Sequence, residues 1–124
     1  MNATRLFFVL GSVFSFFGVT LGAFAAHILK SKLSPEMFNI FEVGVRYQIY
    51  HAFALFIVSW ASSEWNQTNF TLSGWSFVSG ILLFSGSLYA LSLSGIKGFG
   101  AITPLGGILF LWGWLTLFWK VYRA

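Results

Sequence analysis

The residues from Leu6 to Ala26 form an uninterrupted apolar run without an ionisable side chain. A helix needs about 20 such residues to cross the roughly 30 Å hydrocarbon core of a bilayer, and this run has that length. A cleaved signal peptide is the alternative, because Arg5, the apolar run and the small residues of Ala23–Ala25 imitate its three regions. The run exceeds the roughly 7–15 residues of a signal core, so we expect a retained membrane helix.

The rest of the chain has the same character. Only 8% of its 124 residues are charged, and the high share of apolar residues excludes an ordinary soluble domain. The net charge of +4 rests on seven cations scattered near expected helix ends, which indicates membrane flanks and no nucleic-acid surface. The absence of cysteine excludes a disulfide framework, a thiolate nucleophile and an iron–sulfur cluster. We expect one transmembrane domain over residues 1–124.

Start and stop signals divide the chain into helices. Ser34-Pro35 reads as an N-cap followed by a first-turn proline, Gly95 as a helix stop, and Thr103-Pro104 as a second cap with proline. Together with the apolar runs they predict an all-α fold, an integral membrane four-helix bundle. We expect its helices at about residues 5–28, 35–62, 71–94 and 103–122.

Small residues recur along the first helix at spacings of three and four. This spacing places them on one side of the helix, where a neighbouring helix can approach closely. Scattered glycines are common in membrane helices, but an aligned series is better explained by helix packing. The expected packing residues are Gly11, Ser15, Gly18, Gly22 and Ala26.

The second helix carries an acid and a base at membrane depth. Glu42 and Arg46 stand four residues apart with the acid first, the favourable order for an ion pair on one helix. Counting back about 20 residues from Trp60 places both just inside the membrane boundary. Because an unpaired charge there is expensive, we expect the two side chains to pair. The pair is interpreted as structural, or alternatively as a proton or anion site.

Other polar residues of this region complete a candidate polar cluster. At 100° per residue His51 points away from the side that carries the charges. It is interpreted as a neutral imidazole bonded to a neighbouring helix, or alternatively as a proton relay or ligand. His27 ends the first helix near the start of the second. The candidate polar cluster consists of His27, Glu42, Arg46, Tyr50 and His51.

The sequence gives little support for a metal site or a catalytic site. Two histidines and a glutamate without HxxxH or ExxH spacing are too few for a metal site, so we expect no metal and no cofactor. No Ser-His-acid or paired-carboxylate arrangement is present, and the chain contains no Asp. The sequence therefore favours a protein that is not an enzyme, with no catalytic residues.

Four spans place both termini on one side of the membrane. The cations divide almost evenly, with Arg5, Lys120 and Arg123 on the terminal side and Lys30, Lys32, Arg46 and Lys97 opposite. The loop around Glu64 carries no Lys or Arg. Under the positive-inside rule we therefore expect that loop and both termini outside, and the Lys30 and Lys97 loops in the cytoplasm.

Four segments carry a resemblance to a known family: GAFAAH (Gly22–His27), FEVGVRYQIYHAFAL (Phe41–Leu55), LFSGSLYAL (Leu83–Leu91) and ITPLGGILFLWGW (Ile102–Trp114). In order, and over almost the whole chain, they resemble the YgdD/YwdK-like family of small inner-membrane proteins (domain of unknown function 423). The first block there usually reads GAFGAH and the second FETGVRYQ, so Ala25 and Val43 depart from the pattern.

The resemblance implies a four-helix, multi-pass protein of the bacterial inner (plasma) membrane, or of the mitochondrial inner membrane in a eukaryote. It implies no activity, because none is established for the family. It marks as motif positions His27, Glu42, Arg46, Tyr50, His51 and Pro104.

Two functions of different class follow. The first is a structural or accessory subunit that packs in the lipid bilayer as a homo-oligomer or in a larger membrane protein complex. The second is a small transporter, proton pathway or lipid-binding protein that uses Glu42, Arg46 and His51 in a wet or headgroup-filled cavity. Water, phosphate or an ion bonded to the cluster would favour the second function, and a dry, satisfied cluster the first.

Overall fold

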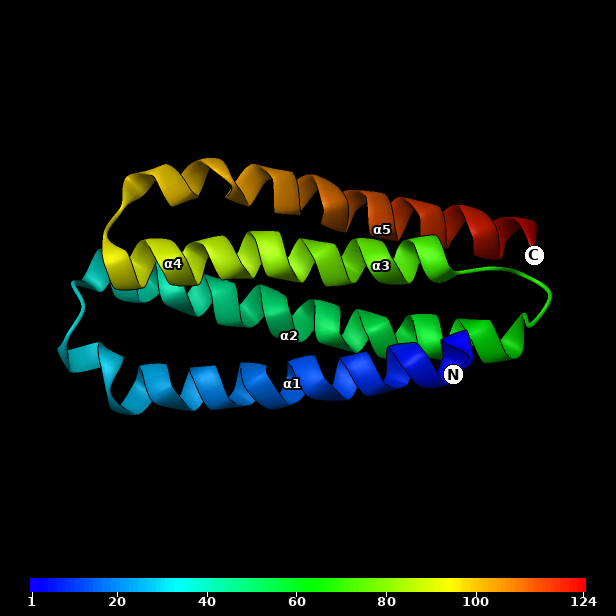
Figure 1. Ribbon diagram of the computed structural model, residues 1–124, viewed down its shortest axis with the longest axis horizontal. Helices are drawn as coiled ribbons and strands as arrows, with labels where there is room; N and C mark the ends of the chain where they lie inside the picture. The colour runs from blue at the N-terminus through cyan, green and yellow to red at the C-terminus, as the bar shows by residue number, and fades with distance from the viewer.

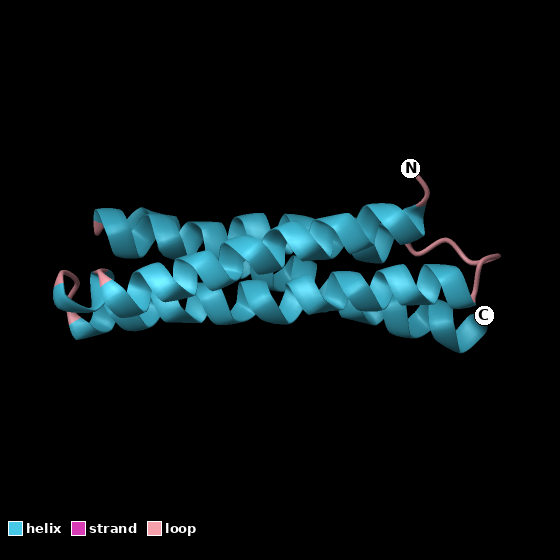
Figure 2. Cartoon of the chain, turned by 90° about the horizontal axis from the view of Figure 1, so that it is seen from below, coloured by secondary structure: helices cyan, strands magenta, loops and turns pink.

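The computed structural model describes all residues, 1–124, and is built from helices without any strand (Figure 2). The third long helix is a continuous rod in which a π-helical turn, Ile81–Ser85, joins two α-helical parts. The expected all-helical fold with four long helices is confirmed, whereas the π-helical turn and two short 3₁₀ turns were not anticipated. The α-helices are α1 (Ala3–His27), α2 (Pro35–Glu64), α3 (Thr71–Gly80), α4 (Gly86–Ser94) and α5 (Thr103–Arg123).

The long helices lie side by side and alternate in direction (Figure 1). α2 and the α3–α4 rod form the inner pair, with α1 packed on α2 and α5 packed on the rod. Both termini and the loop between α2 and α3 lie at one end, on the right of Figure 1. The 3₁₀ turns Leu29–Ser31 and Lys97–Ala101 lie at the other end.

Three of these helical stretches are long and apolar enough to cross a membrane: Ala3–His27, Thr71–Ser94 and Lys97–Arg123. α2 does not meet this criterion, because its charged, histidine, glutamine and tyrosine side chains lower its hydropathy. Its 30 residues correspond to a length of about 45 Å, more than the hydrocarbon core requires. Because α2 lies alongside the three shorter apolar stretches, both of its ends reach the headgroup regions when those stretches span the membrane.

The local start and stop signals are mostly confirmed. The Ser34 hydroxyl accepts a hydrogen bond from the backbone N–H of Met37 at 3.2 Å, as an N-cap does. Gly95 ends α4 with φ of 74°, a left-handed conformation that glycine adopts without strain. The expected capping role of Thr103 is wrong: the residue is already helical, and its hydroxyl lies 2.6 Å from that of Ser87 instead.

The small residues of α1 face α2. A Cβ atom added at Gly11 would lie 3.0 Å from the carbonyl oxygen of Ala52, and one added at Gly18 would lie 2.5 Å from Ile49 Cδ1. Helix α2 thus approaches the backbone of α1 as closely as the glycines allow. The end of the expected series is different: Ala26 is exposed and its neighbour Ala25 is buried, because the contacting side of a straight helix drifts over several turns.

Helix α5 approaches the rod most closely beside the π-helical turn. A Cβ atom added at Gly106 would lie 2.7 Å from Phe84 Cα, and closer still to its backbone nitrogen. One turn further, Phe110 lies against Gly80, so that a large side chain on each helix fills the space left by a glycine on the other. Backbone cannot move aside as a side chain can, so an added methyl group is especially hard to accommodate at Gly106.

We predict that Gly106→Ala lowers the free energy of unfolding by about 1–3 kcal/mol, because the added methyl group overpacks a site bounded by backbone. Gly107→Ala is the matched control, since its Cβ would lie 3.9 Å from Phe84 Cδ2, an ordinary contact. Unfolding in mixed detergent micelles, followed by circular dichroism, measures both. Equal stabilities of the two variants would contradict this description of the α5 contact.

Candidate functional site

The charged members of the candidate polar cluster do not meet. Glu42 and Arg46 are both exposed on α2, and no carboxylate oxygen in the structure lies within 4.0 Å of a Lys, Arg or His nitrogen. The expected Glu42–Arg46 ion pair is therefore wrong for the isolated chain. An exposed i, i+4 pair stabilises a helix by only about 0.2–0.5 kcal/mol, too little to hold two flexible side chains together by spacing alone.

The remaining members are spread over separate surfaces. Tyr50 shares the exposed side of α2 with the charged residues, and 52% of its surface is exposed. His27 is exposed at the end of α1. His51 is buried on the other side of α2, with 5% of its surface exposed. The structure thus divides the cluster into an outward group and one inward histidine.

His51 is held by two hydrogen bonds and a stacked ring. Its Nδ1 lies 2.8 Å from the carbonyl oxygen of Tyr47, and Trp114 on α5 donates its indole N–H to Nε2 at 3.1 Å. The imidazole lies parallel to the Phe110 ring, with a centroid distance of 3.5 Å and an interplanar angle of 6°. This residue therefore joins α2 to α5.

These bonds select one tautomer. The indole nitrogen can only donate, so His51 Nε2 must be an acceptor without a proton. A carbonyl oxygen can only accept, so Nδ1 carries the proton. Both ring nitrogens are thereby used within the protein. Of the two interpretations of His51, the geometry favours the neutral imidazole bonded to a neighbouring helix.

Gln48 is a polar centre that the sequence reasoning did not single out. Its Nε2 donates to the carbonyl oxygen of Phe14 on α1 at 2.9 Å, and its Oε1 accepts from the Tyr89 hydroxyl on α4 at 2.6 Å. With 3% of its surface exposed, it joins three helices. The sequence did carry a signal for it: Gln48 has an amide side chain at membrane depth, one turn after Gly44 and on the side of α2 opposite Arg46.

Hydroxyl groups make the other bonds between helices. The Ser85 hydroxyl donates to the carbonyl oxygen of Gly44 at 2.7 Å, and the hydroxyls of Ser73 and Thr116 lie 2.9 Å apart. Ser15 Oγ is the one buried side-chain polar atom without a hydrogen-bond partner. Nearly every buried polar side chain is thus satisfied inside the protein, as an apolar solvent requires.

An apolar groove runs between α2 and α5. One part, of about 510 Å³, reaches from Tyr47 and His51 to Pro104, and a second, of about 430 Å³, extends past Trp60 to the C-terminal turn of α5. Trp114 borders both parts. In a membrane this groove faces lipid chains, and both nitrogens of the histidine at its floor are already bonded.

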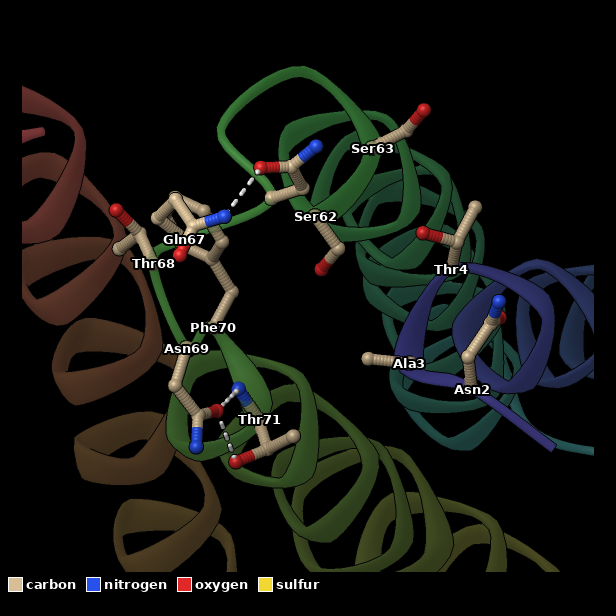
Figure 3. A pocket seen from close by; sticks show the side chains of 11 residues that line it. Asn2, Ala3, Thr4, Ser62, Ser63, Gln67, Thr68, Asn69, Phe70 and Thr71 are labelled. Atoms are coloured by element: carbon tan, nitrogen blue, oxygen red, sulfur yellow. Dashed lines mark hydrogen bonds between the residues drawn. The ribbon is translucent and has the colours of Figure 1, made fainter.

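A polar hollow of about 590 Å³ lies at the end that holds the termini (Figure 3). No charged side chain lines it. Its asparagines are partly occupied locally, since Asn2 Oδ1 accepts from the backbone of Arg5 and Asn69 Oδ1 accepts from Thr71. The lining residues are Asn2, Ala3, Thr4, Ser62, Ser63, Asn66, Gln67, Thr68, Asn69, Phe70 and Thr71.

The structure contains no group of three or more His, Cys, Asp or Glu side chains that could hold a metal ion. The two histidines lie on different elements, His27 at the exposed end of α1 and His51 between α2 and α5. The described geometry therefore supports packing and hydrogen bonding, and it presents no activated nucleophile or paired acid and base.

Comparison with known proteins finds relatives among bacterial membrane proteins. The family described as protein of unknown function (DUF423) matches residues 21–107. A UPF0382 membrane protein of Staphylococcus haemolyticus is 41% identical over 96% of this chain and 97% of its own. The UPF0382 membrane protein YwdK of Bacillus subtilis is 40% identical over 91% of this chain and 93% of its own. No solved structure matches the chain.

We predict an energetic coupling between Gln48 and Tyr89. Gln48→Leu leaves the hydroxyl of the half-buried Tyr89 without its acceptor, whereas Tyr89→Phe removes that hydroxyl. The double variant should therefore lose less stability than the two single losses combined. Hydrogen bonds between membrane helices are worth about 0.6–1.7 kcal/mol, and we expect a coupling in that range. Unfolding free energies of the four proteins measure it. Strict additivity would contradict the bond.

We also predict that His51 is protonated at Nδ1 only. Nitrogen-15 NMR of the labelled protein in lipid should show one protonated and one bare ring nitrogen. Trp114→Phe removes the donor to Nε2 and should shift that resonance, while Trp112→Phe, on the exposed side of α5, should leave it unchanged. A protonated Nε2 in the unmodified protein would refute the assigned bond.

Proposed function

We propose that this chain, which belongs to the family of proteins of unknown function DUF423 and is similar to UPF0382 membrane proteins, is a structural or accessory subunit of a membrane assembly. It packs with copies of itself or with a larger membrane protein complex. Its place is the bacterial inner (plasma) membrane, which it crosses several times as a four-helix bundle with both termini outside.

One observation carries this proposal: apart from Ser15 Oγ, the buried side-chain polar atoms have hydrogen-bond partners inside the chain, and the two largest polar side chains among them bond to neighbouring helices. Gln48 bonds to α1 and α4, and His51 bonds within α2 and to α5. A transport or catalytic site keeps polar groups free for its ligand, at a cost in stability. Here they act instead as fixed links that set the register of the helices.

The chain also leaves groups that a partner could use. Glu42 and Arg46 are exposed without an ion-pair partner on a helix that is expected to lie within the membrane boundary. A charge in that position is costly unless another chain, a headgroup or water stabilises it. These groups therefore support a surface for assembly more than an internal pathway.

The alternative function is a small transporter, proton pathway or lipid-binding protein that uses Glu42, Arg46 and His51 together. A proton pathway through His51 requires an imidazole that can accept and release protons. In this structure protonation of Nε2 would break the bond from Trp114. No observation favours this second candidate.

The proposal is tested by assembly and flux together. We expect the protein purified from its native membranes in mild detergent to run as a homo-oligomer or with one stoichiometric partner in native mass spectrometry. Glu42→Gln with Arg46→Gln should weaken that assembly and leave proton flux in liposomes at the level of protein-free vesicles. Lys97→Gln, in the loop before α5, serves as a control that should retain assembly.

Two results would contradict the proposal. One is a chain that is monomeric and without partner under every mild condition. The other is a proton flux above that of empty vesicles that the neutralised variant loses while its assembly stays intact.

A further inference from the structure

One side of α2 is exposed along nearly the whole helix. Its residues recur at spacings of three and four and fall within an arc of about 80° at 100° per residue. The first half is polar and charged, and the second half is large and apolar. This outward face of α2 consists of Asn39, Glu42, Arg46, Tyr50, Phe53, Ile57 and Trp60.

The register of α1 and α2 gives the depth of the charges. Gly22 of α1 faces Val45, so Arg46 lies one residue deeper, and α1 ends at His27. At 1.5 Å per residue Arg46 therefore lies about 9 Å inside the end of α1. The 25 residues of α1 correspond to about 37 Å, slightly more than the hydrocarbon thickness. Arg46 therefore lies within the edge of the hydrocarbon, where no carboxylate of this chain lies within 4.0 Å of its guanidinium.

We propose that a second copy of this chain docks on the outward face of α2. The two-fold axis runs along the membrane normal, as it must for two copies inserted with the same topology. The two α2 helices then lie parallel, and Glu42 of each copy pairs with Arg46 of the other. This inference rests on the proposed function and names its partner.

The geometry of the face suits this arrangement. In a two-fold contact, if residue i of one copy meets residue j of the other, the reverse contact forms as well, so one acid and one base per chain provide two ion pairs. Four residues correspond to a rise of about 6 Å, which the long arginine side chain can span. Further along α2, from Tyr50 through Phe53 to Trp60 near the opposite membrane boundary, side chains that are 52–58% exposed supply aromatic surface that packs against its own copy.

Charge exchange tests the pairing. In lipid nanodiscs or mild detergent, Glu42→Arg and Arg46→Glu should each raise the dissociation constant of the dimer at least tenfold, because like charges then face each other. The exchanged variant, Glu42→Arg with Arg46→Glu, should return to within about threefold of the original value. Glu36→Arg, the same change outside the outward face, is the matched control and should have little effect.

Cross-linking provides a second readout that does not depend on charge. The chain contains no cysteine, so a single introduced thiol reports its own position. Tyr50→Cys should form a disulfide-linked dimer on mild oxidation. Leu111→Cys should not, although Leu111 on α5 is 71% exposed. Equal cross-linking at both positions, or single reversals that leave the dimer unchanged, would overturn the proposal.

The two proposals fail differently. A protein that assembles with a larger complex but never contacts its own copy through α2 overturns the dimer and leaves the accessory role standing. A monomeric protein with proton flux overturns both.

Discussion

The fold depends on satisfying polar groups without water. In hydrocarbon, a backbone or side-chain polar group left unpaired costs several kcal/mol, so helices must satisfy their backbones internally and their buried polar side chains must bond to neighbouring helices. Gln48 and His51 meet this requirement from α2, one towards α1 and α4 and the other towards α5. Because their partners lie on different helices, the same bonds also set which helices are neighbours and in what register.

Close backbone approach makes these bonds possible. Gly11 and Gly18 bring α1 against α2, and Gly106 brings α5 against the rod beside its π-helical turn. Between membrane helices the packing of small residues replaces the hydrophobic effect as a source of affinity, since lipid chains are as apolar as the side chains they cover. Glycine contact and polar bond therefore support each other: the first brings the backbones together, and the second selects one arrangement.

Helix α2 differs from its neighbours in having two polar sides with different properties. The inward side, with Gln48 and His51, is bonded and buried. The outward side, with Glu42 and Arg46, is exposed and unpaired. A single helix thus holds the monomer together and presents an exposed acid and base to its surroundings, which is why both the accessory role and the dimer contact are proposed for it.

The sequence by itself determined the class of the protein, the bounds of its helices and several of their ends, because hydrophobic length, caps and glycine stops are local properties. It indicated the packing side of α1 as far as Gly22 and the opposite directions of Arg46 and His51 on α2. Only the tertiary structure decided that Glu42 and Arg46 stay apart and that Gln48 bonds to Tyr89 and Phe14. Those contacts depend on where other helices lie, and periodicity along one helix carries no information about its neighbours.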